Sequence, residues 1–183
     1  MEQIKKIVLR EKAFAQTQFE VVQFVDCDFS NASLGNHRFV ECEFVNCNFT
    51  LCSLQGTSFQ DVVFKGCKLL GARFDQCSKF ALSFQFDNCI LDHAVFHELK
   101  ISKTKFSGCR MTEVDFTGAE LKAAVFVDCE LGNAVFERSN LESADLRGAQ
   151  QLALDPNNNT IKKARFTLEQ LPGLLLQYNI KIN

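Results

Sequence analysis

Large apolar residues recur at every fifth position along most of this chain. They run from Phe14 to Phe74 and, after a break, from Leu91 to Leu146. A small residue stands two positions before most of them, and polar or turn-forming residues follow, as in residues 27–31 (Cys-Asp-Phe-Ser-Asn). A period of five fits neither an α-helix, with 3.6 residues per turn, nor a plain strand, whose side chains alternate. The pattern instead indicates a chain built from internal repeats.

Each repeat of five has a small residue first and a large residue third, with other residues between and after them. This order predicts a coil with four sides. We expect the small and the large side chain to point inward from a short extended piece. The last two residues turn the corner, since Gly and Asn adopt tight-turn conformations at low steric cost. Four such pieces close a square coil of twenty residues. Successive coils would then pair backbone to backbone at about 4.8 Å, the usual spacing between strands.

Stacking by twenty residues predicts columns of like side chains. Cys27, Cys47 and Cys67 are twenty apart, and so are the cysteines at 89, 109 and 129. The step from Cys67 to Cys89 is twenty-two residues.

Two extra residues are therefore expected within the segment 77–86. We expect Phe80 to take an inward position there, and a β-bulge to form near Phe84 and Phe86.

This pattern resembles the pentapeptide-repeat family, whose repeat is A(D/N)LXX, over about three quarters of the chain. The resemblance implies an all-β fold, a right-handed quadrilateral β-helix. We assign residues 1–150 to this solenoid. Residues 151–183 are expected to hold a loop, a last rung, a short C-terminal helix and a dimerisation strand.

Nine cysteines raise the alternatives of a disulfide framework or a zinc site, but all of them occupy the small inward position. Free cysteine behaves as a small buried hydrophobe. The odd number and the absence of a secretory signal pattern in residues 1–12 argue against disulfides. We expect core-filling thiols in a reducing cytoplasm, and no membrane span, because no apolar run reaches 18 residues.

The sequence shows no catalytic constellation, glycine-rich phosphate loop or metal-ligand spacing. His93 and His97 are four apart, which on a helix would suggest a metal pair, but on this coil they belong to neighbouring sides. His37 stands at a small inward position, where a hydrogen-bonded interior histidine is favoured over a ligand. We therefore expect no enzyme activity, no cofactor and no metal. Function should come from the outer surface.

Charge is unevenly distributed along the repeat. Residues 20–61 carry a net charge of −5, from six acidic residues and one basic residue, and residues 65–110 carry +4, from eight basic and four acidic. Residues 113–145 hold eight carboxylates against two basic residues, a net charge of −6. The alternative is that these charges only keep the surface solvated and bind no partner. The predicted partner-binding acidic residues are Glu113, Asp115, Glu120, Asp128, Glu130, Glu142 and Asp145.

The C-terminal tail carries its own signals. Residues 167–170 (Thr-Leu-Glu-Gln) form a capping-box pattern. Pro172 is tolerated only in a first turn, so we expect the regular helix to start there. Asn179 can end that helix, and residues 180–182 alternate like a strand. Because an open coil end exposes pairing groups and core, this apolar tail must act as a cap or meet a partner. We favour pairing between two chains.

The tail also resembles the end of the topoisomerase-protecting branch of the family. The residues that carry this resemblance are Leu154-Asp155-Pro156, Asn159-Thr160-Ile161-Lys162, Ala164-Arg165-Phe166, Leu174-Leu175 and Tyr178-Asn179-Ile180. That branch includes quinolone-resistance proteins and immunity proteins against microcin B17 and albicidin. The resemblance implies a homodimer through the C-terminus, and the predicted interface residues are Leu171, Leu174, Leu175, Tyr178, Ile180 and Ile182.

The same resemblance implies a non-catalytic DNA mimic that binds DNA gyrase or topoisomerase IV, makes no direct contact with nucleic acid, and protects the enzyme from a quinolone or a peptide toxin. Family members that protect best against quinolones carry one or two projecting loops, whereas the only irregularity before Leu146 is the two-residue slip. Peptide-toxin immunity or a purely regulatory role therefore stays as open as drug protection. The alternative from a different class is a scaffolding module with another protein partner.

Overall fold

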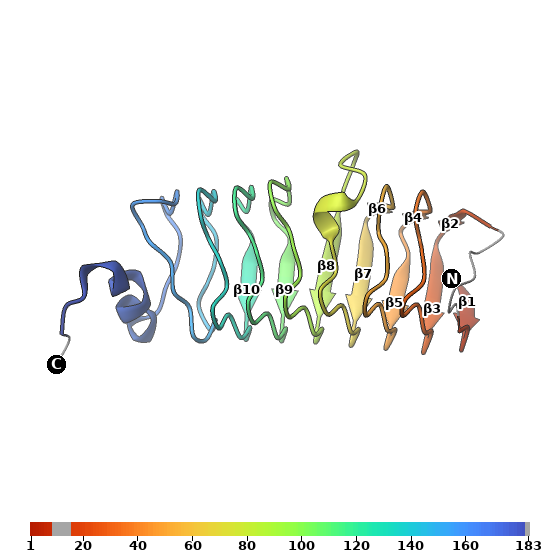
Figure 1. Cartoon of the computed structure of the whole chain (residues 1–183), viewed down its shortest axis with the longest axis horizontal. Coiled ribbons are helices and arrows are strands. Elements are labelled where there is room, and N and C mark those ends of the chain that lie inside the picture. The colour runs from red at the N-terminus through yellow and green to blue at the C-terminus, as the bar shows by residue number, and fades with distance from the viewer. Residues whose placement is uncertain (9–15, 182–183) are drawn as a thin grey trace.

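The computed structural model describes residues 1–8 and 16–181. The chain winds into a rod of stacked coils, with the two termini at opposite ends (Figure 1). The predicted all-β solenoid is confirmed. Of the positions named above, Phe14 and Ile182 lie outside the described residues.

Two parallel sheets run along the rod, one on each of two sides. The shorter sheet consists of β2 (Gln18–Glu20), β4 (Arg38–Val40) and β6 (Ser58–Gln60). The longer sheet consists, in order, of β1 (Glu2–Lys5), β3 (Val22–Val25), β5 (Glu43–Val45), β7 (Val62–Lys65), β8 (Phe84–Asp87), β9 (Lys105–Ser107) and β10 (Val125–Val127).

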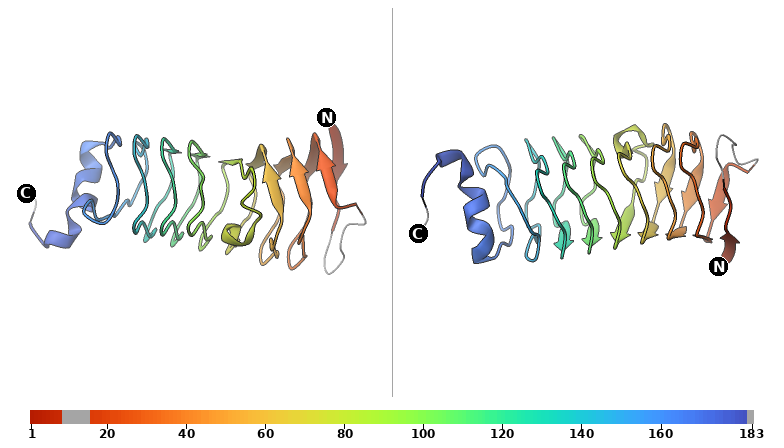
Figure 2. Two further views of the ribbon diagram at one scale, coloured as in Figure 1. Left: turned by 90° about the horizontal axis from the view of Figure 1, so that it is seen from above. Right: turned by 60° about the horizontal axis from the view of Figure 1, so that its bottom comes forward.

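The register between coils is the predicted one. Phe24 pairs with Phe44 and Phe44 with Phe64, each a step of twenty residues, and Phe64 then pairs with Phe86, a step of twenty-two. Single bridges continue the ladders on the remaining sides and reach a last rung at Asp145 and Arg165. Figure 2 shows these stacked coils from two further directions.

Left-handed backbone at the corners makes the sharp turns between sides possible. Asp26, Asn46 and Gly66 form one such column of corners, with φ of 53°, 53° and 61°. Asp, Asn and Gly tolerate this conformation better than other residues. A Cβ at Gly66 would lie only 2.6 Å from Oδ1 of Asn46, so the corner above an asparagine has no room for a side chain.

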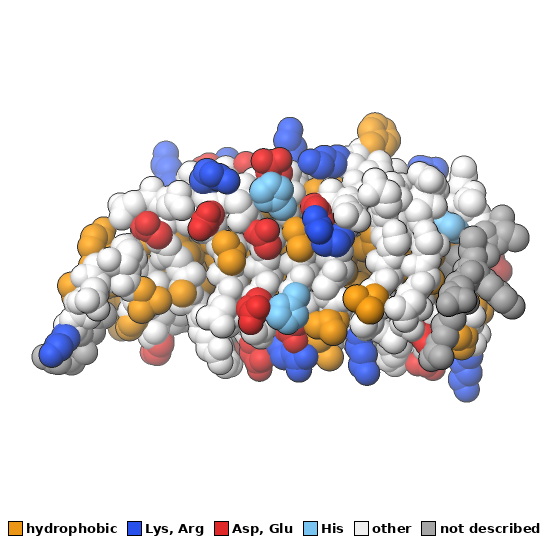
Figure 3. All heavy atoms as spheres, in the orientation of Figure 1, with side chains coloured by type: hydrophobic (Ala, Val, Ile, Leu, Met, Phe, Trp, Pro, Cys, Tyr) orange, Lys and Arg blue, Asp and Glu red, His pale blue; other side chains and the backbone are white. Residues whose placement is uncertain are grey.

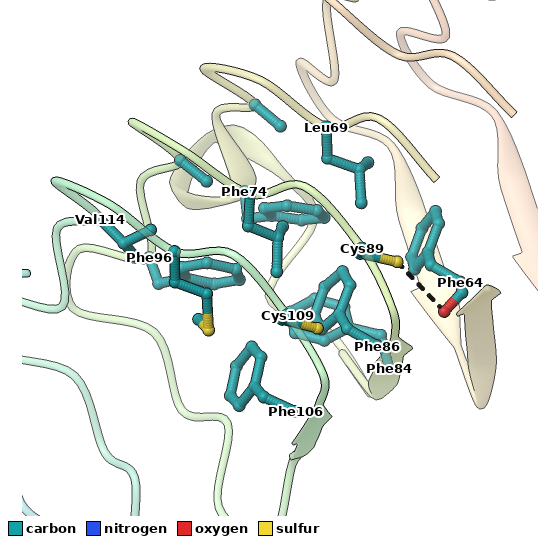
Figure 4. Close-up of a cluster of buried hydrophobic side chains, with 14 of the residues drawn as sticks. Phe64, Leu69, Phe74, Phe84, Phe86, Cys89, Phe96, Phe106, Cys109 and Val114 are labelled. Carbon is teal, nitrogen blue, oxygen red and sulfur yellow. Dashed lines mark hydrogen bonds between the residues drawn. The ribbon is translucent and has the colours of Figure 1, made fainter. Parts of the chain in front are cut away.

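The interior of the rod is filled by the inward side chains. Cys47 and Phe49 are both buried, as predicted. Rings one coil apart stack, as Phe24 and Phe44 do with centroids 4.8 Å apart, and rings on neighbouring sides meet edge to face. Figure 4 shows this packing in the middle of the rod, where the Cys89 thiol donates a hydrogen bond to the Phe64 carbonyl at 3.4 Å.

The irregular coil lies where the slip was predicted, but its internal arrangement differs from the expectation. Residues 79–83 form a loop that rises above the other corners, between β7 and β8 in Figure 1, and a 3₁₀ turn, η1 (Phe74–Gln76), precedes it. Phe80 is exposed, so the prediction that it points inward is wrong. β8 pairs with β7 in continuous register, so the expected bulge at Phe84 and Phe86 is absent.

Phe84 explains this outcome. It stands in the small inward position two residues before Phe86, yet its ring is buried and lies 5.2 Å from the Phe74 ring and 5.1 Å from the Phe86 ring (Figure 4). Leu82 packs against the same core. Together they occupy the space that an inward Phe80 would have used, and the loop is free to leave the rod.

The tail forms 3₁₀ turns, η2 (Leu168–Leu174) and η3 (Leu176–Tyr178). The predicted capping box is confirmed, since the backbone N–H of Thr167 donates to Oε1 of Gln170 at 2.8 Å. The helix therefore begins before Pro172, which lies inside η2, and the predicted start at Pro172 is wrong. Asn179 ends η3 in the left-handed conformation, as expected.

The predicted C-terminal strand is not formed by Ile180 and Lys181, the two of its three residues that the structure describes. Within residues 1–8 and 16–181 no helix is long and apolar enough to cross a membrane.

Candidate functional site

The interior holds thiols, but they are built as packing groups. All nine cysteines are free and buried. Those of the long column donate hydrogen bonds to backbone carbonyls, as Cys47 does to Phe24 at 3.4 Å and Cys67 to Phe44 at 3.3 Å. Burial raises the pKa of the Cys52 thiol to about 12 and also raises the pKa of Cys77. Such thiols lack the exposure and the electropositive surroundings of a nucleophile.

The three histidines occupy the separate places that the coil geometry assigns to them. His37 is buried, and its Nδ1 lies 3.1 Å from the Gly35 carbonyl, in agreement with an interior histidine. His93 pairs with Glu113 at 3.3 Å, whereas His97 pairs with Glu98 at 3.6 Å on the next side. Among the described residues no group of three His, Cys, Asp or Glu side chains is arranged to hold a metal ion.

The predicted acidic residues surround the rod instead of lining one face. Asp115, Glu120, Glu130 and Asp145 belong to four different bridge ladders, one on each side of the coil. This follows from the five-residue period, because outward positions five apart face successive sides. Figure 3 shows acidic side chains scattered between basic ones and histidines on one face of the molecule. The sequence therefore located the carboxylates on the outer wall, but they form no single acidic face.

Basic neighbours offset part of this acidic charge. Asp145 accepts from Arg147 at 2.7 Å and lies 3.7 Å from Arg165, and the Arg147 guanidinium holds the pKa of Asp145 below its usual value. Glu142 pairs with Lys122 at 3.0 Å, which likewise lowers the pKa of Glu142.

Asp128 and Glu130 are the more available pair of carboxylates. Both are exposed, and neither forms an ion pair with another described residue. Their role as partner-binding residues stays a prediction.

The tail closes the end of the rod with its own side chains. Nε2 of Gln170 donates to the carbonyls of Leu146 and Ala149, both at 2.6 Å, and Leu174 is buried against the last coil. Gly173 fits because it has no side chain, since a Cβ there would lie 1.9 Å from the Leu152 carbonyl oxygen. Gln170, Gly173 and Leu174 therefore act as a cap, which is one of the two roles expected for the tail.

Other tail residues remain uncovered. Of the predicted dimer interface, Leu174 is buried within its own chain and Leu175 is half-buried. Leu171, Tyr178 and Ile180 are exposed, and so is Leu176 beside them. A hollow of about 240 Å³ lies among Pro172, Leu175, Leu176, Asn179 and Ile180.

The exposure of Phe80 is the surface feature that sequence analysis missed. A signal for it was present, because Phe84 is a large residue in a position that elsewhere holds a small one. Once Phe84 is counted as core, Phe80 has no inward space left.

Comparisons with known proteins agree with this architecture. The family described as "Pentapeptide repeat region" matches residues 78–155, and "Pentapeptide repeats (8 copies)" matches residues 23–61 and 42–78. No curated protein matches the sequence.

Two solved structures are similar over most of the rod. One is trypsin-treated QnrB1, a plasmid-mediated fluoroquinolone resistance protein, with a TM-score of 0.70 and 19% identity, covering 99% of this chain and 100% of that one. The other is HetL, a pentapeptide-repeat protein involved in heterocyst differentiation regulation from the cyanobacterium Nostoc sp. strain PCC 7120. Its TM-score is 0.71 with 13% identity, covering 88% of this chain and 81% of that one. At these identities the likeness concerns the fold.

Proposed function

Because this chain is a pentapeptide-repeat protein, with repeats matched from residue 23 to residue 155, we propose that it works as a rod bound by another macromolecule. We propose further that it occupies the duplex-binding surface of DNA gyrase or topoisomerase IV and protects that enzyme from a quinolone or a peptide toxin. The observation that carries this proposal is the unbroken stack of coils, whose core is packed with side chains, so that the outer wall is the surface available to a partner.

The dimensions suit such a role. The long ladder has nine rungs, from Ile4 to Phe166, and eight steps of about 4.8 Å give about 38 Å. A duplex of that length carries about 22 phosphate charges, at one per roughly 1.7 Å. Carboxylates that wind around all four sides resemble the phosphates of a duplex in their placement. The net charge of −2 is far smaller, so shape must contribute more than charge.

QnrB1 supports the drug-related form of this proposal, since it has the same fold over its whole length and is a fluoroquinolone resistance protein. The direct test measures gyrase supercoiling and drug-induced DNA cleavage with and without the protein. We expect cleavage complexes to decrease as the protein is added, at a concentration that leaves supercoiling active. Unchanged cleavage at micromolar protein, with both a quinolone and a gyrase-directed peptide toxin, would rule out the proposal.

We also propose that two chains pair through the exposed part of the tail. Leu171, Leu176, Tyr178 and Ile180 leave an apolar surface on the cap, and pairing would remove it from water. Light scattering of the full chain should give the mass of a dimer, and Tyr178→Asp should give a folded monomer whose melting temperature no longer depends on protein concentration. A wild-type monomer at high micromolar concentration would contradict this pairing.

The second candidate function is that of a scaffold for a different protein. The observation in its favour is HetL, which has a similar TM-score over a smaller share of the chain and is involved in heterocyst differentiation regulation. A monomeric chain without effect on gyrase would favour the scaffold.

A further inference from the structure

One corner of the C-terminal half of the rod is basic. Nine basic residues lie between residues 101 and 165, and six of them gather at this corner. We call these six the basic edge: Lys103, Lys105, Lys122, Lys162, Lys163 and Arg165. All six side chains are exposed. The coils that carry them are drawn in green to blue in Figure 1.

The coil geometry holds these side chains in line. Lys103 and Lys163 stand in the same column of corners, with φ of 63° and 61°. Backbone bonds fix the neighbouring coils against one another, since the Lys103 N–H donates to the Lys122 carbonyl at 2.9 Å and the Ser143 N–H to the Lys162 carbonyl at 2.8 Å. Three steps of about 4.8 Å separate Lys103 from Lys163, so the edge runs for about 14 Å along the rod.

The acidic residues at this corner are recessed beneath the basic ones. Glu142 and Asp145 are half-buried, whereas the basic side chains reach solvent. Lys122 pairs with Glu142 and lowers its pKa, and Lys162 and Lys163 add to this effect. Asp145 is held by an arginine outside the edge. Six basic residues against two acidic ones leave a net charge of +4 for a ligand.

The same coils are acidic at the opposite corner. Glu113 stands in the column of corners two sides away, with φ of 56°, and Asp115 and Glu130 lie beside it. The overall charge of −2 therefore hides a separation of charge across the rod. At 0.1 M salt the Debye length is about 10 Å, so an anion at the basic edge is largely screened from the acidic corner.

The side chains of the edge suit phosphate better than carboxylate. Five of the six are lysines, which bind phosphate as point charges, whereas the planar fork of arginine matches a carboxylate. Arginines of these coils do bind carboxylates, as Arg110 binds Asp92 and Arg147 binds Asp145, both at 2.7 Å. The edge itself consists of charged side chains, without the apolar centre typical of a protein interface.

Duplex DNA presents phosphates in a matching array. Each strand carries one phosphate per roughly 3.4 Å of helix axis, so about four phosphates of one strand fall within about 14 Å. That number equals the net charge of +4 on the edge.

We propose that the basic edge binds the phosphate backbone of duplex DNA. The chain then holds DNA directly, which differs from the expectation, drawn from the family resemblance, of no direct contact with nucleic acid. This activity goes beyond the proposed function, because the acidic corner is free to meet an enzyme while the basic edge holds a DNA segment. Backbone contacts carry no sequence information, so the binding is independent of base sequence.

The test is the fluorescence anisotropy of a labelled duplex titrated with the full chain, between about 50 and 200 mM salt. We expect a micromolar Kd at the lowest salt, as for other non-specific DNA binding. The logarithm of the association constant should fall with the logarithm of salt concentration at a slope of about −3.6, because each of about four neutralised phosphates contributes about −0.9.

A pair of double variants locates the site. Lys103→Gln with Lys163→Gln should raise Kd about tenfold or more at low salt and reduce the slope by about 2, since each lysine accounts for about one unit. Glutamine fits such a corner, as Gln151 has φ of 55°. Lys5→Gln with Lys68→Gln is the matched control, since it removes the same charge from exposed positions on other coils. It should bind within twofold of the wild type.

Thermal unfolding of both double variants shows that the rod is intact. Equal loss of duplex binding in both would rule out the basic edge as the site, and no saturable binding at about 0.1 mM protein would rule out DNA binding itself. Polyglutamate that displaces the duplex at equal charge concentration would overturn the phosphate assignment in favour of an acidic protein partner. Gyrase protection is measured separately: a chain that binds duplex without protecting gyrase keeps this inference while the proposed function fails.

Discussion

At the scale of single residues, the inward positions of the coil differ in how much volume they accept. Cys, Ala and Val fill most small positions, and Phe or Leu fills the large ones. Phe84 is the exception to this rule. In the coil that follows β7, loop 79–83 replaces one side, and that side has no large inward residue. The Phe84 ring, although it stands in a small position, fills the space left by the missing large side chain.

This compensation predicts a large effect on stability for Phe84 and a small one for Phe80, four residues before it. Phe84→Ala should lower the free energy of unfolding by about 3–5 kcal/mol, since it removes a fully buried ring and leaves a cavity. Phe80→Ala should change it by less than about 0.5 kcal/mol, since that ring is in solvent. Urea denaturation of the two variants measures both values. A larger loss for Phe80→Ala would mean that its ring packs on the rod.

A second prediction concerns the buried thiols and alkaline pH. The folded-state pKa of Cys52 is raised to about 12, above an unfolded value of about 8.5. The stability from this thiol is thus fully present below pH 8.5 and is lost as pH rises toward 12. The slope approaches 1.4 kcal/mol per pH unit for each such thiol.

Cys52→Ala isolates this contribution. Ala32 and Ala72 occupy the equivalent positions one coil below and one coil above, so alanine fits the column. Urea denaturation between pH 7 and pH 10 should show a shallower alkaline loss for the variant than for the wild type. Parallel curves would mean that Cys52 ionises as readily in the folded rod as in the unfolded chain.

At the scale of elements, the repeat predicts where the chain turns but not where it departs from the coil. Five-residue spacing was sufficient to place the inward rows and the columns of cysteines, because each step repeats the same local geometry. The same count located the slip within 77–86. It could not decide between Phe80 and Phe84, since both are large and apolar, and only three-dimensional packing shows which ring has space.

The tail was harder to predict for a related reason. Its apolar residues follow no repeat, so sequence alone did not separate Leu174, which covers the last coil, from Tyr178, which faces solvent. The capping box was recognisable because it depends on residues three apart. The second role of Gln170, in which its amide reaches the carbonyls of Leu146 and Ala149, depends on contacts more than twenty residues away.

That role makes Gln170 the key residue of the cap. Gln170→Ala removes a donor from two buried carbonyls, of which that of Leu146 keeps the Ala149 N–H at 3.0 Å, and should destabilise the chain by about 1–3 kcal/mol. It should also speed proteolysis of residues 151–181. Gln177→Ala is the matched control, because Gln177 is exposed and bonds only within the tail, to Leu174. Equal proteolysis rates for both variants would show that the cap is held by apolar packing alone.

At the scale of the whole molecule, two acidic segments of the rod, residues 20–61 and 113–145, flank a basic segment, residues 65–110. Carboxylates reach every side because the chain turns a corner at each repeat, which spreads charge around the rod as a duplex does. Ion pairs such as that of Glu142 with Lys122 reduce the local field, so the number of carboxylates overstates the electrostatic attraction. The carboxylates without such partners should matter most for binding.

The last prediction follows from this difference. The double variant Asp128→Asn with Glu130→Gln removes two exposed carboxylates while keeping the corner geometry, since Asn also adopts the left-handed conformation of Asp128. It should weaken gyrase binding on the order of tenfold at low salt, because exposed charge pairs contribute up to about 1 kcal/mol each. Glu142→Gln, which removes a charge already paired with Lys122, should have a smaller effect. Titrations of gyrase with each variant at two salt concentrations measure both. If neutralising the paired Glu142 weakened binding as much as the double variant did, the contact would depend on the overall charge of the rod and not on these two unpaired positions.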